Sequence, residues 1–408
     1  MKFAERMSRL GTETAFEVLA QVNALKAEGR DIVSFSIGEP DFATPENIRE
    51  AGKKAIEDEF THYTPSAGIM EFREVIAEEI NRTRGTDYTA ANVVVTPGGK
   101  PTIFFSMLAL AEPGDEVIYP NPGFPIYESM IDFVGAAAVP LPLEEEYAFS
   151  FDVGKLEERV SKKTQFLILN SPQNPTGGVV PRESLERVAE LARKFDFWVL
   201  SDEIYSRLVY DGEFQSITQF DGMKDRTIIL DGHSKTWAMT GWRLGFGVYP
   251  AGLAEGIARL MTNSNSCTAA FTQVAGIEAI TGDQSGADMM RDTFLKRRDI
   301  IVDGLNEIEG ISCLNPAGAF YVWPNVTGAC GNLGLPHSKA LQEYLLFEAG
   351  VAVLGRQCFG RRAEGEEQEY VRFSYAASTE EIQEGLRRIE EVITDADRAQ
   401  KFWAGREA

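Results

Sequence analysis

The sequence predicts an α/β protein, with a mostly parallel sheet between helices and a smaller α+β unit. Two patterns indicate this fold. Between about residues 90 and 250, short apolar runs alternate with amphipathic helical runs, which is typical of a parallel sheet covered on both faces. From Ala251 the order changes to a long helical segment, several short apolar runs and a closing helix.

Six apolar runs in the first region have the length and composition of strands buried on both faces. They are VVVT, EVIYP, FLILN, FWVLSD, TIIL and LGFGVY. Between two of them, PRESLERVAELARKFD places Leu185, Val188, Ala192 and Phe195 at helical spacing behind Pro181, which suits a first helical turn. Ligands of such a sheet bind beyond the carboxyl ends of its strands.

The last part of the chain predicts an α+β unit joined by the N-terminal segment. A long helical segment from Ala251 to Arg298, broken near Gly282, precedes GISCL, AFYVWP, VAVL and YVRFSYA. The final helix opens with Ser378 and Glu381 in capping-box spacing. The predicted division gives a large domain of residues 46–290 and a small domain of residues 1–45 and 291–408.

Composition excludes several functional classes. The chain has 408 residues, of which 44% are hydrophobic and 25% charged, and a net charge of −22; such acidity disfavours binding to nucleic acid or anionic membranes. Its four cysteines are far apart and its three histidines have no metal-ligand spacing, so neither a disulfide framework nor a metal site is expected. The N-terminus lacks a signal-peptide pattern, and a cytoplasmic location is predicted.

Chemically distinctive residues follow four of the predicted strands. They are the PGGK turn of residues 97–100, Asn174 in SPQNPTGG, Asp202 with Tyr205 in SDEIY, and Lys235 with Arg243 in GHSKTWAMTGWRLG. Singly, each has an ordinary explanation as a strand-to-helix turn, a loop, an ion pair or a surface charge. Together they lie on one edge of one sheet. A ligand with a phosphate, a basic ring nitrogen, a phenolic oxygen and an aldehyde would use all of them, and pyridoxal phosphate is such a ligand.

Eight motifs in register extend this interpretation over nearly the whole chain. They are SIGEPDFATP, THYTPSAGIMEFR, VTPGGKP, NSPQNPTGG, SDEIYSRLVY, SKTWAMTGWR, NPAGAFY and VRFSYA. In this order they resemble the class I pyridoxal-phosphate-dependent aminotransferases of the aspartate aminotransferase superfamily, fold type I. The resemblance implies a seven-stranded sheet in the large domain, and a homodimer with shared active sites.

The resemblance also implies roles for individual residues. Lys235 would bond covalently to the coenzyme and move the substrate proton, Asp202 would pair with the ring nitrogen, and Tyr205 would contact the phenolic oxygen. Arg372 would bind the substrate α-carboxylate, assisted by Gly38 and Asn174. The implied coenzyme-binding set is Gly99, Lys100, Phe124, Asn174, Asp202, Tyr205, Ser234, Lys235 and Arg243, with Tyr63 from the neighbouring subunit; no metal is implied.

One departure from the family pattern affects the expected phosphate contacts. Gly232 occupies a position where one family branch has a phosphate-binding serine, so phosphate binding is expected to rest more on Arg243 and the PGGK amides. His233 is expected to pack beside the lysine rather than act as a base.

The expected reaction is transfer of an amino group from an L-amino acid to a 2-oxo acid, 2-oxoglutarate, by a ping-pong mechanism. TNSNSCTAAF contains no arginine for a distal carboxylate, whereas Lys100 matches a lysine that serves this purpose in another branch. An aspartate-like donor is therefore preferred. Alanine or aromatic donors, and a β-eliminating lyase on the same scaffold, remain alternatives. A regulatory coenzyme-binding domain would carry an appended DNA-binding region, and this sequence shows no basic N-terminal domain of that kind. A dehydrogenase would have a GxGxxG motif after its first strand, and none is found there.

Overall fold

The computed structural model describes residues 3–363 and 365–407. Its main sheet has seven strands in the order β2-β8-β7-β6-β5-β3-β4. The strands are β2 (Val93–Thr96), β3 (Glu116–Asn121), β4 (Ala137–Pro142), β5 (Thr164–Asn170), β6 (Trp198–Asp202), β7 (Thr227–Gly232) and β8 (Gly245–Val248). Only β8 is antiparallel to its neighbours in this sheet. The predicted α/β class and the seven-stranded, mostly parallel sheet are confirmed.

The six predicted apolar runs form β2, β3, β5, β6, β7 and β8, but the run pattern did not indicate β4. This strand, AAVPLP, lies at the edge of the sheet and its residues are mostly half-buried. Pro140 and Pro142 lack an N–H donor, which an edge strand tolerates because one side of it has no neighbouring strand. The prolines and the partial burial hide this strand from a search for continuous apolar runs.

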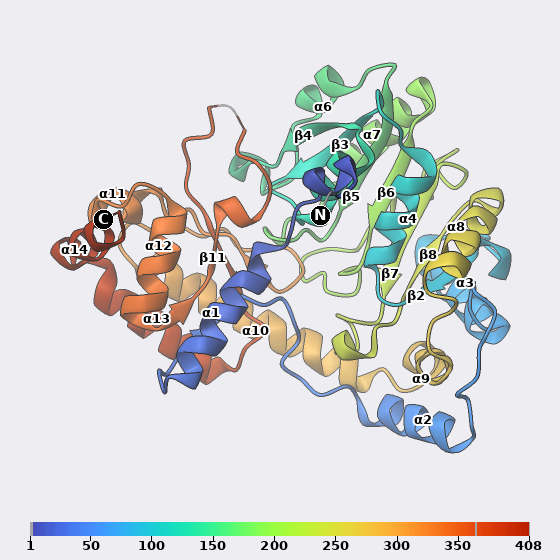
Figure 1. Cartoon of the computed structure of the whole chain (residues 1–408), viewed down its shortest axis with the longest axis horizontal. Helices are drawn as coiled ribbons and strands as arrows, with labels where there is room; N and C mark the ends of the chain where they lie inside the picture. The colour runs from blue at the N-terminus through green and yellow to red at the C-terminus, as the bar shows by residue number, and fades with distance from the viewer. Residues whose placement is uncertain (1–2, 364, 408) are drawn as a thin grey trace.

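Helices cover both faces of the main sheet (Figure 1). Alternate strand residues point to opposite faces: Ile168 and Leu200 pack in one buried cluster, and Leu167 and Val199 in another. The helices of this part of the chain are α2 (Glu46–Glu57), α3 (Met70–Arg84), α4 (Lys100–Leu110), α5 (Ile126–Val134), α6 (Val153–Arg159), α7 (Arg182–Phe195), α8 (Ala251–Ser264) and α9 (Ala270–Thr281).

A smaller α+β part combines the C-terminal region with the N-terminal segment. Its three-stranded sheet has the order β11-β12-β9, and β1 pairs in parallel with β10. The strands are β1 (Val33–Ser34), β9 (Tyr321–Val322), β10 (Val351–Ala352), β11 (Leu354–Gly355) and β12 (Val371–Ser374). Its helices are α1 (Thr14–Ala27), α11 (Thr327–Leu333), α12 (Ser338–Tyr344), the π-helical η6 (Leu345–Ala349), α13 (Thr379–Ile393) and α14 (Ala396–Glu407).

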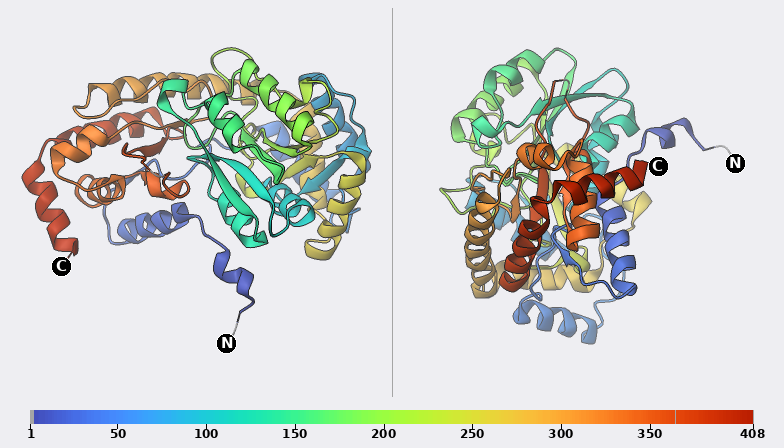
Figure 2. Two further views of the ribbon diagram at one scale, coloured as in Figure 1. Left: turned by 90° about the horizontal axis from the view of Figure 1, so that it is seen from above. Right: turned by 90° about the vertical axis from the view of Figure 1, so that its left-hand side faces the viewer.

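The long helical segment predicted from Ala251 to Arg298 is three helices rather than two. Besides the break predicted near Gly282, residues 265–269 separate α8 from α9. The third helix, α10 (Ser285–Glu307), extends from the main sheet to the smaller part (Figures 1 and 2). The predicted boundary after residue 290 falls inside α10, and the division into domains stays a prediction. At the start of α13, the predicted capping box of Ser378 and Glu381 is present.

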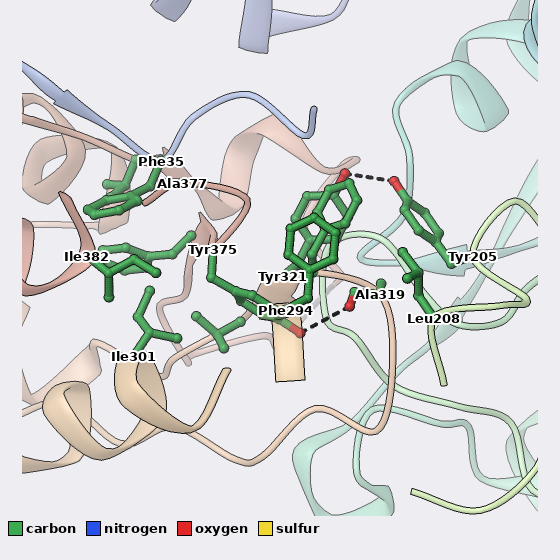
Figure 3. Close-up of a cluster of buried hydrophobic side chains, with 14 of the residues drawn as sticks. Phe35, Tyr205, Leu208, Phe294, Ile301, Ala319, Tyr321, Tyr375, Ala377 and Ile382 are labelled. Atoms are coloured by element: carbon green, nitrogen blue, oxygen red, sulfur yellow. Dashed lines mark hydrogen bonds between the residues drawn. The ribbon is translucent and has the colours of Figure 1, made fainter. Parts of the chain in front are cut away.

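One buried cluster joins the smaller part to the end of the main sheet. It includes Phe35 from the N-terminal segment, Phe294 from α10, Ile382 from α13 and Tyr205 from the segment after β6 (Figure 3). Because these residues come from four distant parts of the chain, the cluster fixes the position of the smaller part against the sheet edge. No helix in the described part of the chain is long and apolar enough to cross a membrane.

A buried charge network anchors the ends of β6 and β7. From the last turn of α3, the Arg84 guanidinium donates to Glu203 Oε2 at 3.0 Å and to Asp231 Oδ2 at 2.8 Å. Ser201 and Ser216 also donate to the Glu203 carboxylate. Burial raises the pKa of Asp231 to about 7, against the effect of the Arg84 charge. Glu203 and Asp231 border the two segments that carry the site residues, so this network positions the site.

Replacing Arg84 by Met should therefore destabilise the protein strongly, because two buried carboxylates lose their counter-ion. We expect the free energy of unfolding, measured in urea by circular dichroism, to fall by about 3 kcal/mol or more. Arg82→Met is the matched control, since Arg82 pairs with Glu79 on the same helix but its side chain is 70% exposed. Its effect should stay within about 0.5 kcal/mol, and equal effects of the two substitutions would contradict the role of the network.

Candidate active site

A pocket of about 530 Å³ lies at the carboxyl ends of the main-sheet strands, between the sheet and the smaller part. Of the residues that the sequence predicted for the site, the pocket is lined by Gly38, Gly99, Lys100, Phe124, Asn174, Asp202, Tyr205, Ser234, Lys235, Arg243 and Arg372. The structure therefore brings together every predicted residue except Tyr63.

Lys235 follows β7 and presents its amine to this pocket. Its Nζ donates to the carbonyl of Gly38 at 2.5 Å, and within the described residues it forms no ion pair with a carboxylate. Withdrawal from water and, second to it, the nearby positive charge of Arg372 together lower the pKa of Lys235 to about 8. A lysine with such a pKa has a useful fraction of neutral, nucleophilic amine near neutral pH.

Asp202 ends β6 and is 5% exposed. Burial raises the pKa of its carboxyl to about 6, while a hydrogen bond from the Tyr127 hydroxyl, at 2.5 Å, acts in the opposite direction. The carboxylate is thus mainly ionised at neutral pH, in a buried place without an arginine or lysine bonded to it among the described residues. A buried carboxylate of this kind favours a cationic or protonated group on a ligand.

An anion cradle forms where the segment after β2 meets Arg243. Gly98 has φ of 86°, and a Cβ on it would lie 2.2 Å from Arg243 Nη2. Gly99 ends this turn, and α4 begins at Lys100 with its free N–H groups at the pocket. A helix N-terminus, a glycine turn and an exposed arginine are the elements that bind phosphate groups in proteins.

Close packing explains the glycine at position 232. A Cβ there would lie 3.0 Å from Gly245 Cα, 3.2 Å from the Leu244 carbonyl oxygen and 3.3 Å from Ile204 Cδ1. A serine at this position would therefore need its neighbours to shift. The cradle of Gly98, Gly99 and Arg243 has to bind an anion without a side chain from residue 232.

Arg372 reaches the pocket from β12, on the opposite side from Lys235's strand. Its guanidinium donates to Asn174 Oδ1 at 2.9 Å and to the carbonyl of Ser36 at 2.5 Å. The side chain is buried, yet Nε has no hydrogen-bond partner in the described part of the chain. An arginine that is held in place while one donor remains unused is suited to bind a carboxylate.

Tyr321, which the sequence analysis did not single out, connects the two sides of the pocket. Its hydroxyl lies 2.7 Å from the Tyr205 hydroxyl (Figure 3), and the Arg372 guanidinium lies 4.5 Å from its ring centroid. A Cβ on Gly38 would come within 1.9 Å of the Tyr321 oxygen. Gly38 is therefore required for the N-terminal segment to pass over this tyrosine.

Lys100 lies at the outer side of the pocket in an aromatic and charged surrounding. Its ammonium forms an ion pair with Glu13 and lies 5.3 Å from the Phe124 ring centroid and 5.8 Å from that of Phe16. The Phe124 ring packs edge-on against Tyr127 at 5.9 Å and presents itself to the pocket.

Two residues near the predicted site lie outside the pocket. Tyr63 is 91% exposed, on the segment between α2 and α3. His233 is fully buried and stacks on Trp237 with ring centroids 4.9 Å apart. Burial lowers the pKa of His233 to about 3, so this imidazole is neutral at physiological pH and does not face the pocket.

Sequence reasoning missed Glu13, Ser36, Tyr127 and Tyr321 as pocket residues. Tyr321 lies in the quoted motif NPAGAFY, but its apolar neighbours make it indistinguishable from a core tyrosine. Ser36 opens the quoted motif SIGEPDFATP, but only Gly38 of that motif was given a role. Glu13 lies outside the quoted motifs, and its position at the pocket depends on tertiary packing.

Comparisons with known proteins agree with this geometry. Residues 30–389 match the family described as aminotransferase class I and II. The chain is 39% identical to an aspartate aminotransferase of Pyrococcus horikoshii, over 89% of this chain and 91% of that protein. It is 38% identical to an aromatic-amino-acid aminotransferase of Thermococcus litoralis, over 89% and 92% of the two chains.

A solved structure of the aspartate aminotransferase from Thermus thermophilus with maleate has the same fold. It superposes with a TM-score of 0.90 at 34% identity, over 96% of this chain and 100% of that chain. The match to the family model, the sequence identity to the relatives and the structural superposition each extend over most of the chain. The chain therefore belongs to the class I and II aminotransferases.

Proposed function

We propose that this aminotransferase moves the amino group of an L-amino acid to 2-oxoglutarate by a ping-pong mechanism, with both substrates using the same pocket. The observation that carries this proposal is the Lys235 amine, which has a lowered pKa and faces a pocket that also contains Asp202 and Arg372. Such an amine can act as a nucleophile and as a base near neutral pH.

The pocket fits pyridoxal 5'-phosphate at each of its functional groups. Arg243 and the Gly98–Gly99 turn, with the N-terminus of α4, would hold the phosphate. The buried Asp202 carboxylate would face the ring nitrogen. Tyr205 and Asn174 would contact the phenolic oxygen, Phe124 would cover the ring, and Ser234 would lie beside the lysine; all of these residues line the pocket.

When bound, pyridoxal phosphate supplies a ring that withdraws electrons from the substrate Cα. Lys235 would take the proton from the substrate Cα and hold it for the transfer step, which its pKa of about 8 permits near neutral pH. Asp202 is mainly charged above about pH 6 and would keep a proton on the nitrogen that faces it. Arg372, held by Asn174 and Ser36, would bind the substrate α-carboxylate and orient Cα toward Lys235.

We infer that the preferred donor is aspartate-like, because Lys100 lines the pocket and its charge would attract a distal carboxylate. The aspartate aminotransferases among the relatives support this inference. Aromatic donors are the second candidate. The Phe16 and Phe124 rings around Lys100 offer apolar contacts to an aromatic side chain, and one relative is named for aromatic amino acids.

We also propose that the enzyme is a homodimer in which Tyr63 reaches the pocket of the partner. Tyr63 is 91% exposed, and on the same stretch of chain Phe60 is 47% and Met70 56% exposed. A group of exposed apolar side chains is typical of a surface that another protein covers.

Two further proposals concern the whole chain. Residues 46–290 form a large domain, residues 1–45 and 291–408 form a small one, and the enzyme is located in the cytoplasm.

Lys235→Ala should lower the transfer rate from aspartate to 2-oxoglutarate by more than about 10³-fold, because it removes both the nucleophile and the base. Oxaloacetate production in a coupled assay measures this rate. Lys162→Ala, at an exposed lysine, is the control and should retain full activity. Normal activity of Lys235→Ala would contradict the proposal. Release of pyruvate and ammonia from an alanine that carries a leaving group on Cβ, without a 2-oxo acid acceptor, would favour the lyase.

Lys100→Met should separate acidic from aromatic donors. Methionine keeps the apolar stem against Phe124 but removes the charge, so kcat/KM for aspartate should fall by about tenfold or more, while that for phenylalanine should fall much less. Steady-state kinetics with both donors and 2-oxoglutarate measure the two values. An equal loss with both donors would contradict a role of Lys100 in recognising the side chain.

A further inference from the structure

A charged pair bridges the outer side of the pocket. Glu13 immediately precedes α1, and Lys100 begins α4; their side chains form an ion pair, and both residues line the pocket. The Glu13 side chain is 19% exposed and that of Lys100 is 41% exposed. The N-terminal segment thus places a carboxylate on the lysine that the proposed function assigns to the substrate side chain.

Lys100 is the pocket cation to which the proposed function assigns a second substrate carboxylate, because the other cations have other partners. Among the residues that the structure describes, four cationic side chains line the pocket: Lys100, Lys235, Arg243 and Arg372. On the proposed function, Lys235 reacts with the coenzyme, Arg243 binds its phosphate and Arg372 binds the α-carboxylate. A distal carboxylate therefore has to meet Lys100, whose charge Glu13 already neutralises.

The Glu13 carboxylate is free to move away from Lys100 without disrupting α1. Glu13 occupies the N-cap position, but its side chain accepts no capping hydrogen bond from the helix. Among the described residues, Lys100 is the one that donates a hydrogen bond to this carboxylate. The Phe16 and Phe124 rings remain beside the ammonium when the carboxylate leaves. The contact can thus be exchanged by rotating one side chain.

We propose that Glu13 determines substrate specificity as an exchangeable counter-ion of Lys100. With an uncharged side chain in the pocket, the Glu13 carboxylate stays on Lys100, so no unpaired charge faces the apolar group. With a dicarboxylate, the distal carboxylate replaces Glu13 on Lys100. One pocket then accepts an aromatic donor and a dicarboxylate acceptor in the two halves of a ping-pong reaction. This inference rests on the proposed function.

Binding of two unreactive acids to the coenzyme-loaded enzyme tests the exchange. Maleate carries two carboxylates, whereas 3-phenylpropionate carries one carboxylate and an aromatic ring. Because Glu13→Gln removes the competitor for Lys100, it should tighten maleate binding about fivefold to tenfold. Binding of 3-phenylpropionate should not tighten, because this acid brings no second carboxylate to the Lys100 charge that Glu13→Gln leaves unpaired. Isothermal titration calorimetry measures both dissociation constants without relying on turnover.

Glu17→Gln is the matched control, since Glu17 lies in the first turn of the same helix, is exposed and does not line the pocket. It removes the same charge and should leave both dissociation constants unchanged. Unchanged maleate binding in Glu13→Gln, or an equal change for the two acids, would overturn the exchange while leaving the proposed function intact. An enzyme that shows no coenzyme absorbance after incubation with pyridoxal phosphate would overturn both.

Discussion

The half-buried Lys235 amine, held beside other cations and bonded only to a backbone carbonyl among the described residues, is the constraint on which the rest of the site depends. Its withdrawal from water is unfavourable for the charged form, and this lowers its pKa to about 8. A carboxylate bonded to Lys235 would raise that pKa again and lower the reactivity of the amine. The fold instead places Asp202 on the adjacent strand, bonded to Tyr127, so acid and amine face one pocket as separate groups.

This arrangement follows from the parallel sheet. The strands β2, β5, β6 and β7 run in the same direction, and the segments after their carboxyl ends bring the anion cradle, Asn174, Asp202 and Lys235 to one edge. Glycines at two of these strand ends allow the backbone to pack closely against neighbouring residues. Gly98 gives room to Arg243, and Gly232 packs against Gly245. The smaller part then closes the pocket with Arg372 and Tyr321, and the N-terminal segment adds Gly38 and Glu13.

The sequence predicted the parts of the molecule that depend on local patterns. The six continuous apolar runs, the capping box of Ser378 and Glu381, and the order of the strand ends are all found in the structure. The pocket residues were predicted because the family motifs name them, and parallel strand order explains why they meet. The edge strand β4 escaped prediction, because its prolines and half-buried residues break the apolar pattern. Tyr321 escaped because its apolar neighbours make it resemble a core tyrosine, and Glu13 escaped because no quoted motif contains it.

The reactivity of Lys235 can be measured directly in the coenzyme-free protein. Competitive labelling with trace acetic anhydride between about pH 6 and pH 11, followed by mass spectrometry, reports the neutral fraction of each lysine amine; the exposed Lys162 provides the internal reference for the reagent. Labelling of Lys235 should rise with pH and reach its midpoint at about pH 8, because only the neutral amine reacts. A midpoint near the ordinary lysine value of about 10.4 would contradict the account.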